Sequence, residues 1–359
     1  MVDSKQAPLD SAAAAKAAFA SVQDKPFPDD IFTAPELRWA VIGCGVIANQ
    51  MAQSLALAGR KLAGVANRTL SKAQAFAEQY GIEKVYESVE DLYADPGIDA
   101  VYITTPHNTH ITYLRDALAA GKHVLCEKAI TLNSAELDEA RAIADEHNVV
   151  LMDATTVLHM PLYQELRRRM DAGEFGRMNL AQLNFGSYKE YGDLTNRFYN
   201  RNLAGGAMLD IGVYALSVMR LFMASQPIEV VSLGNTCETG VDVAGGIVCR
   251  NAEQQLGVVS LTLHSKQPKR SIISFDKCYI EVNEYPRADH ATIVWTADGH
   301  REEVHAGTEA YALCYEMADL EKAVAGDDSK RELLSYASDV MELMTKLRAD
   351  WGVVYPEEE

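Results

Sequence analysis

The sequence lacks several features that would assign it to a specialised class of protein. Its six cysteines are scattered, at positions 44, 126, 237, 249, 278 and 314, and none forms a C-x-x-C pair. This spacing predicts free thiols in a reducing cytoplasm rather than a disulfide framework. No apolar run approaches the length of a membrane span, and no basic-then-apolar signal pattern opens the chain. We therefore expect a cytoplasmic protein with no membrane partner.

Positive charge is also scarce. The chain has 33 lysines and arginines against 51 aspartates and glutamates, which gives a net charge of −18. This balance argues against nucleic acid or an anionic membrane as a partner. The hydrophobic fraction of 48% and the charged fraction of 23% are those of a globular protein, and 359 residues suffice for two domains.

Strand-like and helix-like segments alternate between residues 38 and 152. This alternation predicts an α/β Rossmann-type domain with a parallel sheet and right-handed crossovers. The expected strands are 40–42, 62–66, 84–86, 100–104, 123–126 and 149–152. The expected helices are 46–59, 71–80, a helix beginning at 88, 109–120 and 134–147. Residues 1–37 form an arm with an alanine-rich helix over 11–22, which lies either on the surface or on a partner subunit.

Residues 153–359 have a different pattern, in which strands follow one another with few helices between them. Such a run predicts an α+β domain with a large, mostly antiparallel open sheet. The expected strands are 179–186, 230–233, 244–249, 256–263, 271–275, 279–282 and 292–295. The expected helices are 162–172, 208–223, 311–324 and 332–347. We expect this domain to bind substrate and to oligomerise, with the active site in the cleft between the domains.

A glycine-rich turn follows the first expected strand. Gly43, Gly45 and Ala48 have the spacing G-x-G-x-x-A before a helix-compatible segment. In a dinucleotide-binding turn the first glycine permits the turn, the second lets backbone approach a pyrophosphate, and the small third residue lets the helix pack on the strand. Val46 and Ile47 would then lie at the helix N-terminus, beside the phosphates. The alternative is a structural turn, because such spacings also arise by chance.

The end of the second expected strand selects between the two nicotinamide cofactors. An acidic residue there usually binds the ribose diol of NAD, but this chain has Asn67 and Arg68. A guanidinium can pair with a 2′-phosphate and lie on the adenine face. We therefore expect NADP(H) to be preferred, with NAD(H) possible if Arg68 is only exposed and Asn67 binds the diol.

Polar residues close the fourth expected strand, at the sheet edge where ligands lie. The candidates for cofactor contact there are Thr104, Thr105, Pro106, Asn108 and His110. Pro106 stops the strand, and Thr105 or Asn108 can cap the following helix. His107 and His110 permit a metal interpretation, but no companion carboxylate or cysteine cluster supports it, so we expect no metal.

A glutamate and a lysine end the fifth expected strand at the same edge. Glu127 is a candidate cofactor contact, and Lys128 is a candidate for cofactor binding, substrate binding and catalysis. Beside an oxidised nicotinamide ring and partly desolvated, Lys128 should have a lowered pKa and could orient a hydroxyl or shuttle its proton. The alternative is that Lys128 pairs with Glu127 at the surface.

A last constellation runs from Arg197 to Tyr214 and contains two glycines that lead into a helix. Asp210 and Tyr214 stand four residues apart, so they share one helix face. A carboxylate and a phenol there can hold a substrate hydroxyl and relay its proton. Alternatively, Tyr214 packs in the core and Asp210 caps the helix. Arg197 or Arg201 could bind an anion or shield the cleft, and Arg197 is a candidate substrate contact.

Together these motifs resemble the glucose–fructose oxidoreductase / inositol dehydrogenase (Gfo/Idh/MocA-type) family over residues 38–350. The matching segments are the glycine turn, Glu127-Lys128, and Gly205-Gly206 with Asp210 and Tyr214. The segment from Glu238 to Asp242 is similar to the branch of dimeric dihydrodiol dehydrogenases and NADP-dependent D-xylose dehydrogenases.

The resemblance implies reversible hydride transfer between NADP(H) and a sugar or cyclic alcohol. It assigns catalytic roles to Lys128, Asp210 and Tyr214, and it implies homodimers or homotetramers formed through the C-terminal sheet. Two family positions differ here. Where the family has a proline after the lysine, this chain has Ala129, which should leave that turn less rigid. Where the family has an arginine near the cofactor and substrate, this chain has Leu158, and His159 could take over part of the role of that arginine.

The sequence thus predicts an NADP(H)-dependent oxidoreductase that transfers hydride to or from a sugar, polyol or cyclic diol. Two alternatives stay open. One is an NAD-dependent inositol-type dehydrogenase or another reductase of the family. The other is a non-catalytic NADP-dependent sugar sensor of the same fold, against which the retention of Lys128, Asp210 and Tyr214 argues.

Overall fold

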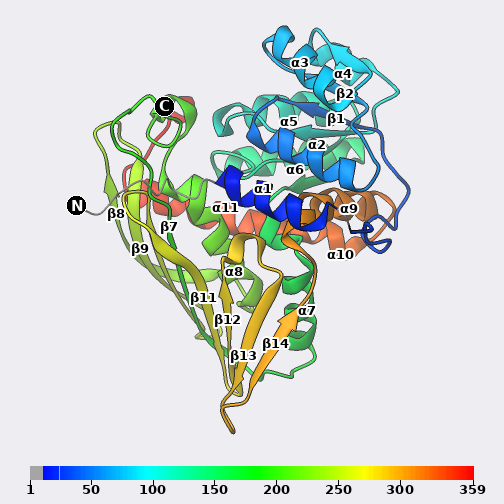
Figure 1. The fold of residues 1–359 in the computed structure, drawn as a ribbon. Coiled ribbons are helices and arrows are strands. Elements are labelled where there is room, and N and C mark those ends of the chain that lie inside the picture. The colour runs from blue at the N-terminus through cyan, green and yellow to red at the C-terminus, as the bar shows by residue number, and fades with distance from the viewer. Residues whose placement is uncertain (1–10, 24) are drawn as a thin grey trace, which may run out of the picture.

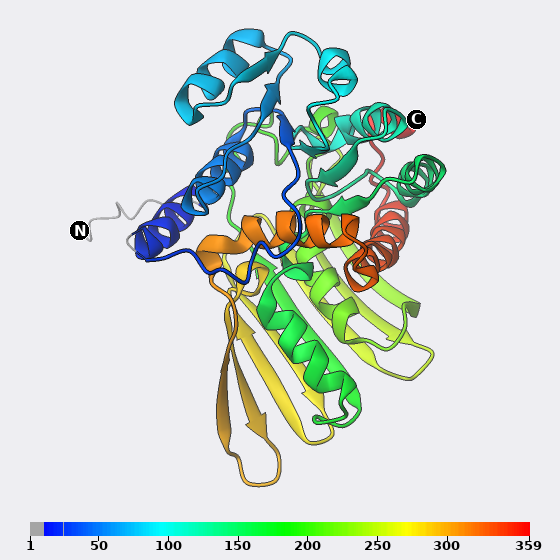
Figure 2. The same ribbon diagram turned by 90° about the vertical axis from the view of Figure 1, so that its right-hand side faces the viewer.

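The computed structural model describes residues 11–23 and 25–359, and shows two sheets joined by helices (Figures 1 and 2). The expected arm, residues 1–37, is described from its eleventh residue onward except at position 24. The expectation for its first ten residues lies outside the described part of the chain.

The first sheet is parallel, six-stranded and ordered β3-β2-β1-β4-β5-β6. Its strands are β1 Trp39–Ile42, β2 Gly64–Ala66, β3 Lys84–Tyr86, β4 Ala100–Ile103, β5 His123–Cys126 and β6 Leu151–Asp153. The connecting helices are α2 Val46–Leu57, α3 Leu70–Tyr80, α4 Val89–Ala94, α5 His110–Ala119 and α6 Ser134–His147. The predicted Rossmann-type fold is confirmed.

Local sequence explains where several of these helices begin and end. Ser88 accepts a hydrogen bond from the backbone N–H of Asp91 at 3.1 Å, and so caps α4. Asn133 accepts one from Glu136 N at 3.0 Å and caps α6. Gly81 ends α3 with a φ of +65°, a left-handed conformation that glycine adopts without steric cost.

The second sheet is eight-stranded and ordered β14-β13-β12-β11-β7-β10-β9-β8, with only the β7–β10 pair parallel. Its strands are β7 Met178–Gly186, β8 Pro227–Thr236, β9 Asp242–Asn251, β10 Leu256–Thr262, β11 Gln267–Phe275, β12 Cys278–Asn283, β13 His290–Trp295 and β14 Arg301–His305. Helices α7 Pro161–Asp171 and α8 Val213–Phe222 accompany it, and α8 packs on β7, β10 and β11. The large, mostly antiparallel open sheet is confirmed, although the sequence did not identify β14 as a separate strand.

Three helices follow the second sheet: α9 Ala312–Val324, α10 Asp328–Arg331 and α11 Leu333–Asp350. The buried side chains of Leu313, Met317 and Leu320 on α9 belong to the same core as strand β1 of the first sheet. Helix α11 contacts both α6 and α8. These helices therefore connect the two sheets. The domain boundary that the sequence places at residue 152 stays a prediction.

The arm contains the expected helix, α1 Ser11–Val22, and it packs on its own chain (Figure 1). Helix α1 contacts α2 and the turn Glu309–Tyr311 that precedes α9. The ring of Phe27 meets that of Tyr311 edge-on at 5.0 Å, and the guanidinium of Arg60 lies 4.0 Å from the Phe32 ring centroid. The arm is thus fixed across the region where α2 and α9 meet.

One described segment, Arg201–Phe222, is long and apolar enough by composition to cross a membrane, with a mean hydropathy of 1.3. In the fold, 83% of its apolar window is buried, as in the core helix of a folded domain.

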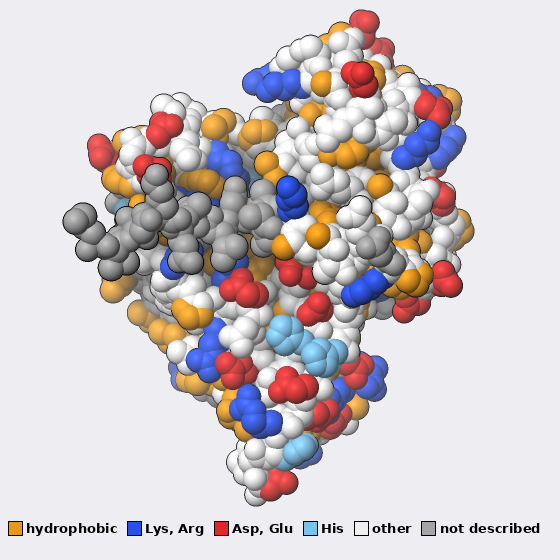
Figure 3. All heavy atoms as spheres, viewed as in Figure 1, with side chains coloured by type: hydrophobic (Ala, Val, Ile, Leu, Met, Phe, Trp, Pro, Cys, Tyr) orange, Lys and Arg blue, Asp and Glu red, His pale blue; other side chains and the backbone are white. Residues whose placement is uncertain are grey.

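On the face shown in Figure 3, acidic and basic side chains are interspersed. The net charge of −18 is therefore not gathered into a single acidic patch on that face.

Candidate active site

The glycine-rich turn lies between β1 and α2, at the carboxyl edge of the parallel sheet. Gly43 has a φ of +103°, and a Cβ there would lie 2.6 Å from Thr104 Oγ1. Gly45 precedes α2, no side chain caps that end of the helix, and no atom lies within 4 Å of where its Cβ would be. Free N–H groups beside open space fit a pyrophosphate. Ala48 is fully buried, as close packing of the helix on the strand requires.

Basic side chains follow strand β2, the neighbour of β1 in the sheet. Arg68 is exposed directly after β2, and Asn67 donates from Nδ2 to Thr69 O at 3.0 Å. Burial raises the pKa of Cys44 to about 11, and the charge of Lys72 lowers it, so the Lys72 ammonium is near enough to act on the glycine turn. Lys72 was not among the residues predicted for the site. Its place in the first turn of α3, just after the end of β2 that selects the cofactor, is a signal that could have identified it.

Two further candidates at the glycine turn have different environments. The Val46 side chain is exposed, whereas Ile47 is partly buried against the core of the first sheet. Both residues stand in the first turn of α2, where the backbone N–H groups have no helical partner. Their backbone is therefore better placed than their side chains to contact a phosphate.

The end of β4 is tied to β1 and to the second half of the chain. Thr104 donates from Oγ1 to Ile42 O at 3.0 Å, and Thr109 Oγ1 lies 2.8 Å from Thr105 Oγ1. The expectation that Thr105 or Asn108 caps the next helix was wrong, because a 3-10 turn comes before α5 and neither side chain caps it. Asn108 instead donates from Nδ2 to Asn202 O at 3.2 Å and to Glu357 Oε1 at 2.6 Å. Pro106 is exposed beside them.

The two histidines of this segment bind backbone carbonyls. His110 is fully buried, with Nε2 2.8 Å from Thr105 O and Nδ1 3.1 Å from Ala129 O, so it ties the end of β4 to the end of β5. His107 Nε2 lies 3.0 Å from the carbonyl oxygen of Lys128. Burial lowers the pKa of His107 to about 3, helped by the charges of His110 and Lys128, so its imidazole is neutral. Among the residues described, no three His, Cys, Asp or Glu side chains are grouped to hold a metal ion.

Lys128, Asp210 and Tyr214 meet although Lys128 follows β5 of the first sheet and the other two residues lie in a π-helical turn and α8, which accompany the second sheet. Lys128 Nζ donates to the backbone oxygen of Asp210 at 2.7 Å and lies 3.4 Å from Asp210 Oδ1. The same ammonium lies 4.8 Å from the centroid of the Tyr214 ring. Arg197, which is largely exposed, approaches Asp210 Oδ1 from outside, with Nη2 at 3.4 Å. The three predicted catalytic residues and Arg197, a further predicted substrate contact, therefore form one cluster.

The charges in this cluster fix its protonation. Burial raises the pKa of Asp210, but Lys128 and Arg197 lower it further, so the net shift is downward and the carboxylate is ionised. Burial lowers the pKa of Lys128, and Tyr214 and Asp210 outweigh burial, so the ammonium is held. Burial raises the pKa of the Tyr214 phenol, against the effect of Lys128. The lowered pKa expected for Lys128 applies when an oxidised nicotinamide ring is bound beside it. In the protein alone, the pKa of Lys128 is raised.

The helix that carries Asp210 begins with an unusual turn. Met208–Gly212 is a π-helical turn that continues into α8, so Asp210 and Tyr214 are not related by a regular α-helical repeat. A Cβ on Gly212 would lie 2.9 Å from Met208 Sδ and 3.0 Å from Leu261 Cδ1, so a larger residue there would make these two side chains shift. The prediction that Asp210 and Tyr214 face the same place agrees with their common contact with Lys128.

Glu127 does not pair with Lys128 at the surface, which was one alternative. Its carboxylate accepts a hydrogen bond from the hydroxyl of Tyr102, a fully buried residue of β4. Burial raises the pKa of Glu127, against the lowering effects of Tyr102 and Lys128. Glu127 therefore belongs to the buried layer beneath the cluster, and Lys128 points from it to Asp210.

The two residues that depart from the family pattern, Ala129 and Leu158, are both buried. Ala129 is fully buried, and the Lys128–Ala129 peptide bond is cis. His159, suggested as a partial replacement for the family arginine, is fully buried, and its Nδ1 lies 3.1 Å from Asp319 Oδ2. Its ring is thus paired inside the core, and its replacement of the arginine stays a prediction.

Comparisons with known proteins agree with this geometry. A model described as an oxidoreductase family with an NAD-binding Rossmann fold (GFO_IDH_MocA) matches residues 37–155, and a GFO/IDH/MocA C-terminal domain model matches residues 163–281. The trans-1,2-dihydrobenzene-1,2-diol dehydrogenase of Mus musculus is 32% identical over 69% of this chain and 75% of its own length. That of Sus scrofa is 28% identical over 90% of this chain and 99% of its own.

Solved structures show the same fold at lower identity. A 3-ketoreductase from Actinomadura kijaniata in complex with NADP has a TM-score of 0.75 and 24% identity, and the match covers 88% of this chain and 98% of that one. Levoglucosan dehydrogenase in complex with NADH and levoglucosan has a TM-score of 0.75 and 19% identity, over 86% and 97% of the two chains. At these identities the likeness establishes the fold alone.

Proposed function

Because this chain belongs to the Gfo/Idh/MocA family of NAD(P)-dependent oxidoreductases that act on CH–OH groups, we propose that it transfers hydride between NADP(H) and a sugar, polyol or cyclic diol. The observation that carries this proposal is the contact of Lys128 with both Asp210 and Tyr214. These are the groups that the family resemblance assigns to catalysis, and they come together from the end of β5 in the first sheet and from the helix that packs on the second sheet.

The choice of NADP(H) rests on charge. Lys72 acts on Cys44 in the glycine turn, and Arg68 follows β2, the strand beside β1. The segment from Asn67 to Lys72 contains no carboxylate. A 2′-phosphate is attracted by such a pair of cations, whereas a ribose diol gains little from it. NAD(H) binding through Asn67 is the outcome that would contradict this part of the proposal.

The nicotinamide, when bound, supplies or accepts the hydride, and this chain moves the proton. Since both Lys128 and Tyr214 hold protons at neutral pH, either can donate one to the oxygen of a carbonyl that is being reduced. Asp210, ionised and in contact with Lys128, keeps the ammonium in place and in its charged state. For alcohol oxidation one of the two groups must first lose its proton, so oxidation should require a higher pH than reduction.

Replacement of the lysine tests this proposal. Lys128→Met should lower kcat by on the order of 100-fold or more, because general acid–base assistance is lost, while leaving the Kd for NADPH nearly unchanged. Lys61→Met, which removes an exposed lysine paired with Glu83, is the matched control. The readouts are steady-state rates on a panel of sugars and cyclic diols, and NADPH fluorescence titration. Wild-type turnover in Lys128→Met would refute the role.

We also propose that two copies of the chain associate through the outer face of the second sheet. Large apolar side chains are exposed there, on the edge strand β8 and its neighbours β9 and β10: Ile228, Val231, Leu233, Val248 and Leu256. Leu233 has 83% of its surface exposed and Val231 75%. Contiguous apolar surface of this kind is typical of a protein–protein interface, and its edge strand presents unpaired backbone groups.

Light scattering after gel filtration tests the association. Leu233→Glu should convert a dimer or tetramer into a monomer, because the interface would bury an unpaired charge. Ala119→Glu adds the same charge on the exposed side of α5 and should leave the oligomer intact. A wild-type chain that elutes as a monomer would contradict this proposal.

The six cysteines are all free. Four of them, Cys126, Cys249, Cys278 and Cys314, are buried. Free thiols persist in a reducing compartment, so we propose that the enzyme works in the cytoplasm. Fractionation of cells followed by immunoblotting would test this.

A further inference from the structure

The turn that leads to Asp210 is held by residues outside the predicted site. Gly205 and Gly206 form this turn, and Gly206 has a φ of +127°. A Cβ on Gly205 would lie 2.7 Å from Arg197 O, and one on Gly206 would lie 2.3 Å from Asp242 Oδ1. The two glycines are therefore required by the close approach of neighbouring groups, and Asp242 is one of these groups.

Asp242, the first residue of β9, caps the helix of Asp210. Its Oδ2 accepts a hydrogen bond from Met208 N at 2.6 Å, at the start of the π-helical turn. No residue next to that turn caps it with a side chain. Asp242 is fully buried, and among the described residues its Oδ1 has no hydrogen-bond partner. A carboxylate at a helix N-terminus stabilises that end of the helix, so Asp242 holds the turn from the sheet side.

Tyr355 holds the same turn from the other side. Its ring is fully buried, and its hydroxyl donates a hydrogen bond to Gly205 O at 2.7 Å. The guanidinium of Arg348 lies 4.7 Å from the centroid of this ring. Leaving a buried carbonyl oxygen without a hydrogen-bond donor costs free energy. The hydrogen bond from the Tyr355 hydroxyl therefore favours one position of the Gly205–Gly206 turn.

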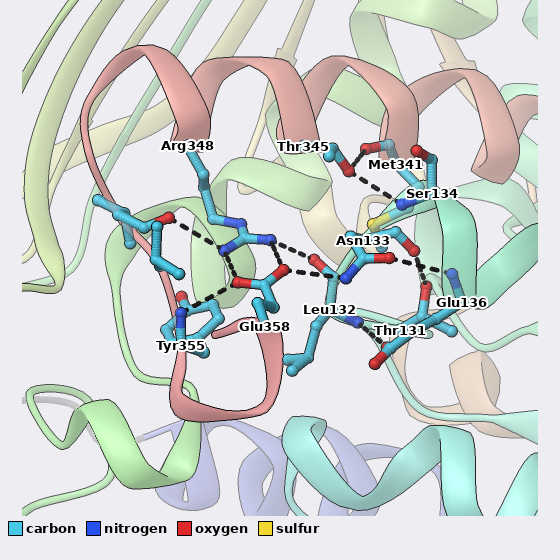
Figure 4. Close-up of polar contacts among 12 residues, drawn as sticks. Thr131, Leu132, Asn133, Ser134, Glu136, Met341, Thr345, Arg348, Tyr355 and Glu358 are labelled. Carbon is cyan, nitrogen blue, oxygen red and sulfur yellow. Dashed lines mark hydrogen bonds and ion pairs between the residues drawn. The ribbon is translucent and has the colours of Figure 1, made fainter.

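The segment that contains Tyr355 is also hydrogen-bonded to Leu132 and Asn133 (Figure 4). Glu358 Oε1 accepts from Arg348 Nη2 at 2.7 Å and from Asn133 Nδ2 at 3.0 Å. Arg348 Nη2 also donates to Leu132 O at 2.6 Å. Leu132 and Asn133 follow Lys128 by four and five residues. The network therefore joins the chain just after Lys128 to the turn just before Asp210.

Accepting the proposed function, we infer that Tyr355, Glu358, Arg348 and Asp242 are positioning residues that fix Asp210 against the ammonium of Lys128. Each contacts a residue two to five positions from Asp210 or Lys128 in sequence. None of them touches Lys128 or the Asp210 carboxylate in the contacts described. Substitution of any of these four residues should weaken the contact between Asp210 and Lys128, although both of those residues stay in the chain.

Tyr355→Phe tests this inference because it deletes one hydroxyl and keeps the ring. We expect kcat to fall by about tenfold or more, since small displacements of catalytic groups have effects of that size, with the Kd for NADPH unchanged. A second readout needs no cofactor: the pH midpoint at which an amine reagent modifies Lys128, located by peptide mass mapping, should shift downward as the carboxylate moves away. Glu358→Gln should shift this midpoint in the same direction.

Tyr336→Phe, on α11 with its ring near Arg220, is the matched control and should behave as wild type. If Tyr355→Phe does not fold, as judged by circular dichroism, Glu358→Gln decides. An unchanged midpoint and kcat in a folded variant overturn the inference even where Lys128→Met is inactive. If Lys128→Met is fully active but the midpoint still shifts in Tyr355→Phe, the proposed function fails and the positioning of the pair stands.

Discussion

The Arg68 side chain provides the sharpest test of cofactor choice. Arg68→Ala removes one of the two cations near the expected 2′-phosphate. A hydrogen bond to a charged group contributes about 1.5–3 kcal/mol, and the lower half of this range applies because Arg68 is exposed to water. Since about 1.4 kcal/mol corresponds to a factor of ten, the Kd for NADPH should rise roughly 10- to 30-fold. The Kd for NADH should stay within about twofold, because NADH has no phosphate there.

Fluorescence titration of both cofactors against wild type, Arg68→Ala and Lys72→Ala measures these constants. Lys72→Ala should weaken NADPH binding by less, because a lysine acts as a point charge without a bidentate fork. Both effects should shrink at high salt, since exposed charges are screened. Equal loss of NADH and NADPH binding, or tighter binding of NADH by wild type, would refute the phosphate-site reasoning and favour a diol contact by Asn67.

Three further predictions follow from buried groups and close contacts. The rate of alcohol oxidation should rise with pH while carbonyl reduction falls, because the pKa values of Lys128 and Tyr214 are both raised; parallel pH profiles in the two directions would contradict this. Burial raises the pKa of Asp153 from 3.8 to about 7, so the folded state holds this proton more tightly than the unfolded chain does. The resulting stability is fully present below about pH 4 and is lost between about pH 4 and 7, by roughly 1 kcal/mol per pH unit; urea unfolding of Asp153→Asn across this range should show a flatter pH dependence than wild type. Gly245→Ala would place a Cβ 2.3 Å from the Trp351 ring, whereas nothing lies within 4 Å at Gly246; the first should lower stability by about 1–3 kcal/mol in thermal melts, and the second by much less.

Local sequence was sufficient for most of the elements. Strands β3 and β5 begin and end where they were expected, because turn residues and polar side chains bound their short apolar runs. Strand β14 was not identified because Arg301–His305 has only one buried apolar side chain, Val304, and lies at the edge of its sheet. A strand with so little apolar content gives little periodic signal.

The candidate site could be predicted as a set of residues but not as an arrangement. The family motifs identified Lys128, Asp210 and Tyr214 together. The π-helical turn could not be foreseen, because it depends on Asp242, which lies 34 residues away from Met208 in sequence. The contact of His107 with the carbonyl of Lys128, and the burial of His159 against Asp319, likewise arise from tertiary packing.

The geometry of Lys128 restricts how a substrate oxygen can approach. An ammonium has three N–H donors, and two of them are directed to the backbone oxygen and the carboxylate of Asp210, at 2.7 and 3.4 Å. One donor is left for a substrate. The Tyr214 ring lies 4.8 Å from the same nitrogen, so an oxygen bound to the third N–H would lie near that ring. Under the proposed function, a substrate hydroxyl held by Lys128 would exchange its proton with the Tyr214 phenol, while Asp210 holds the ammonium in place.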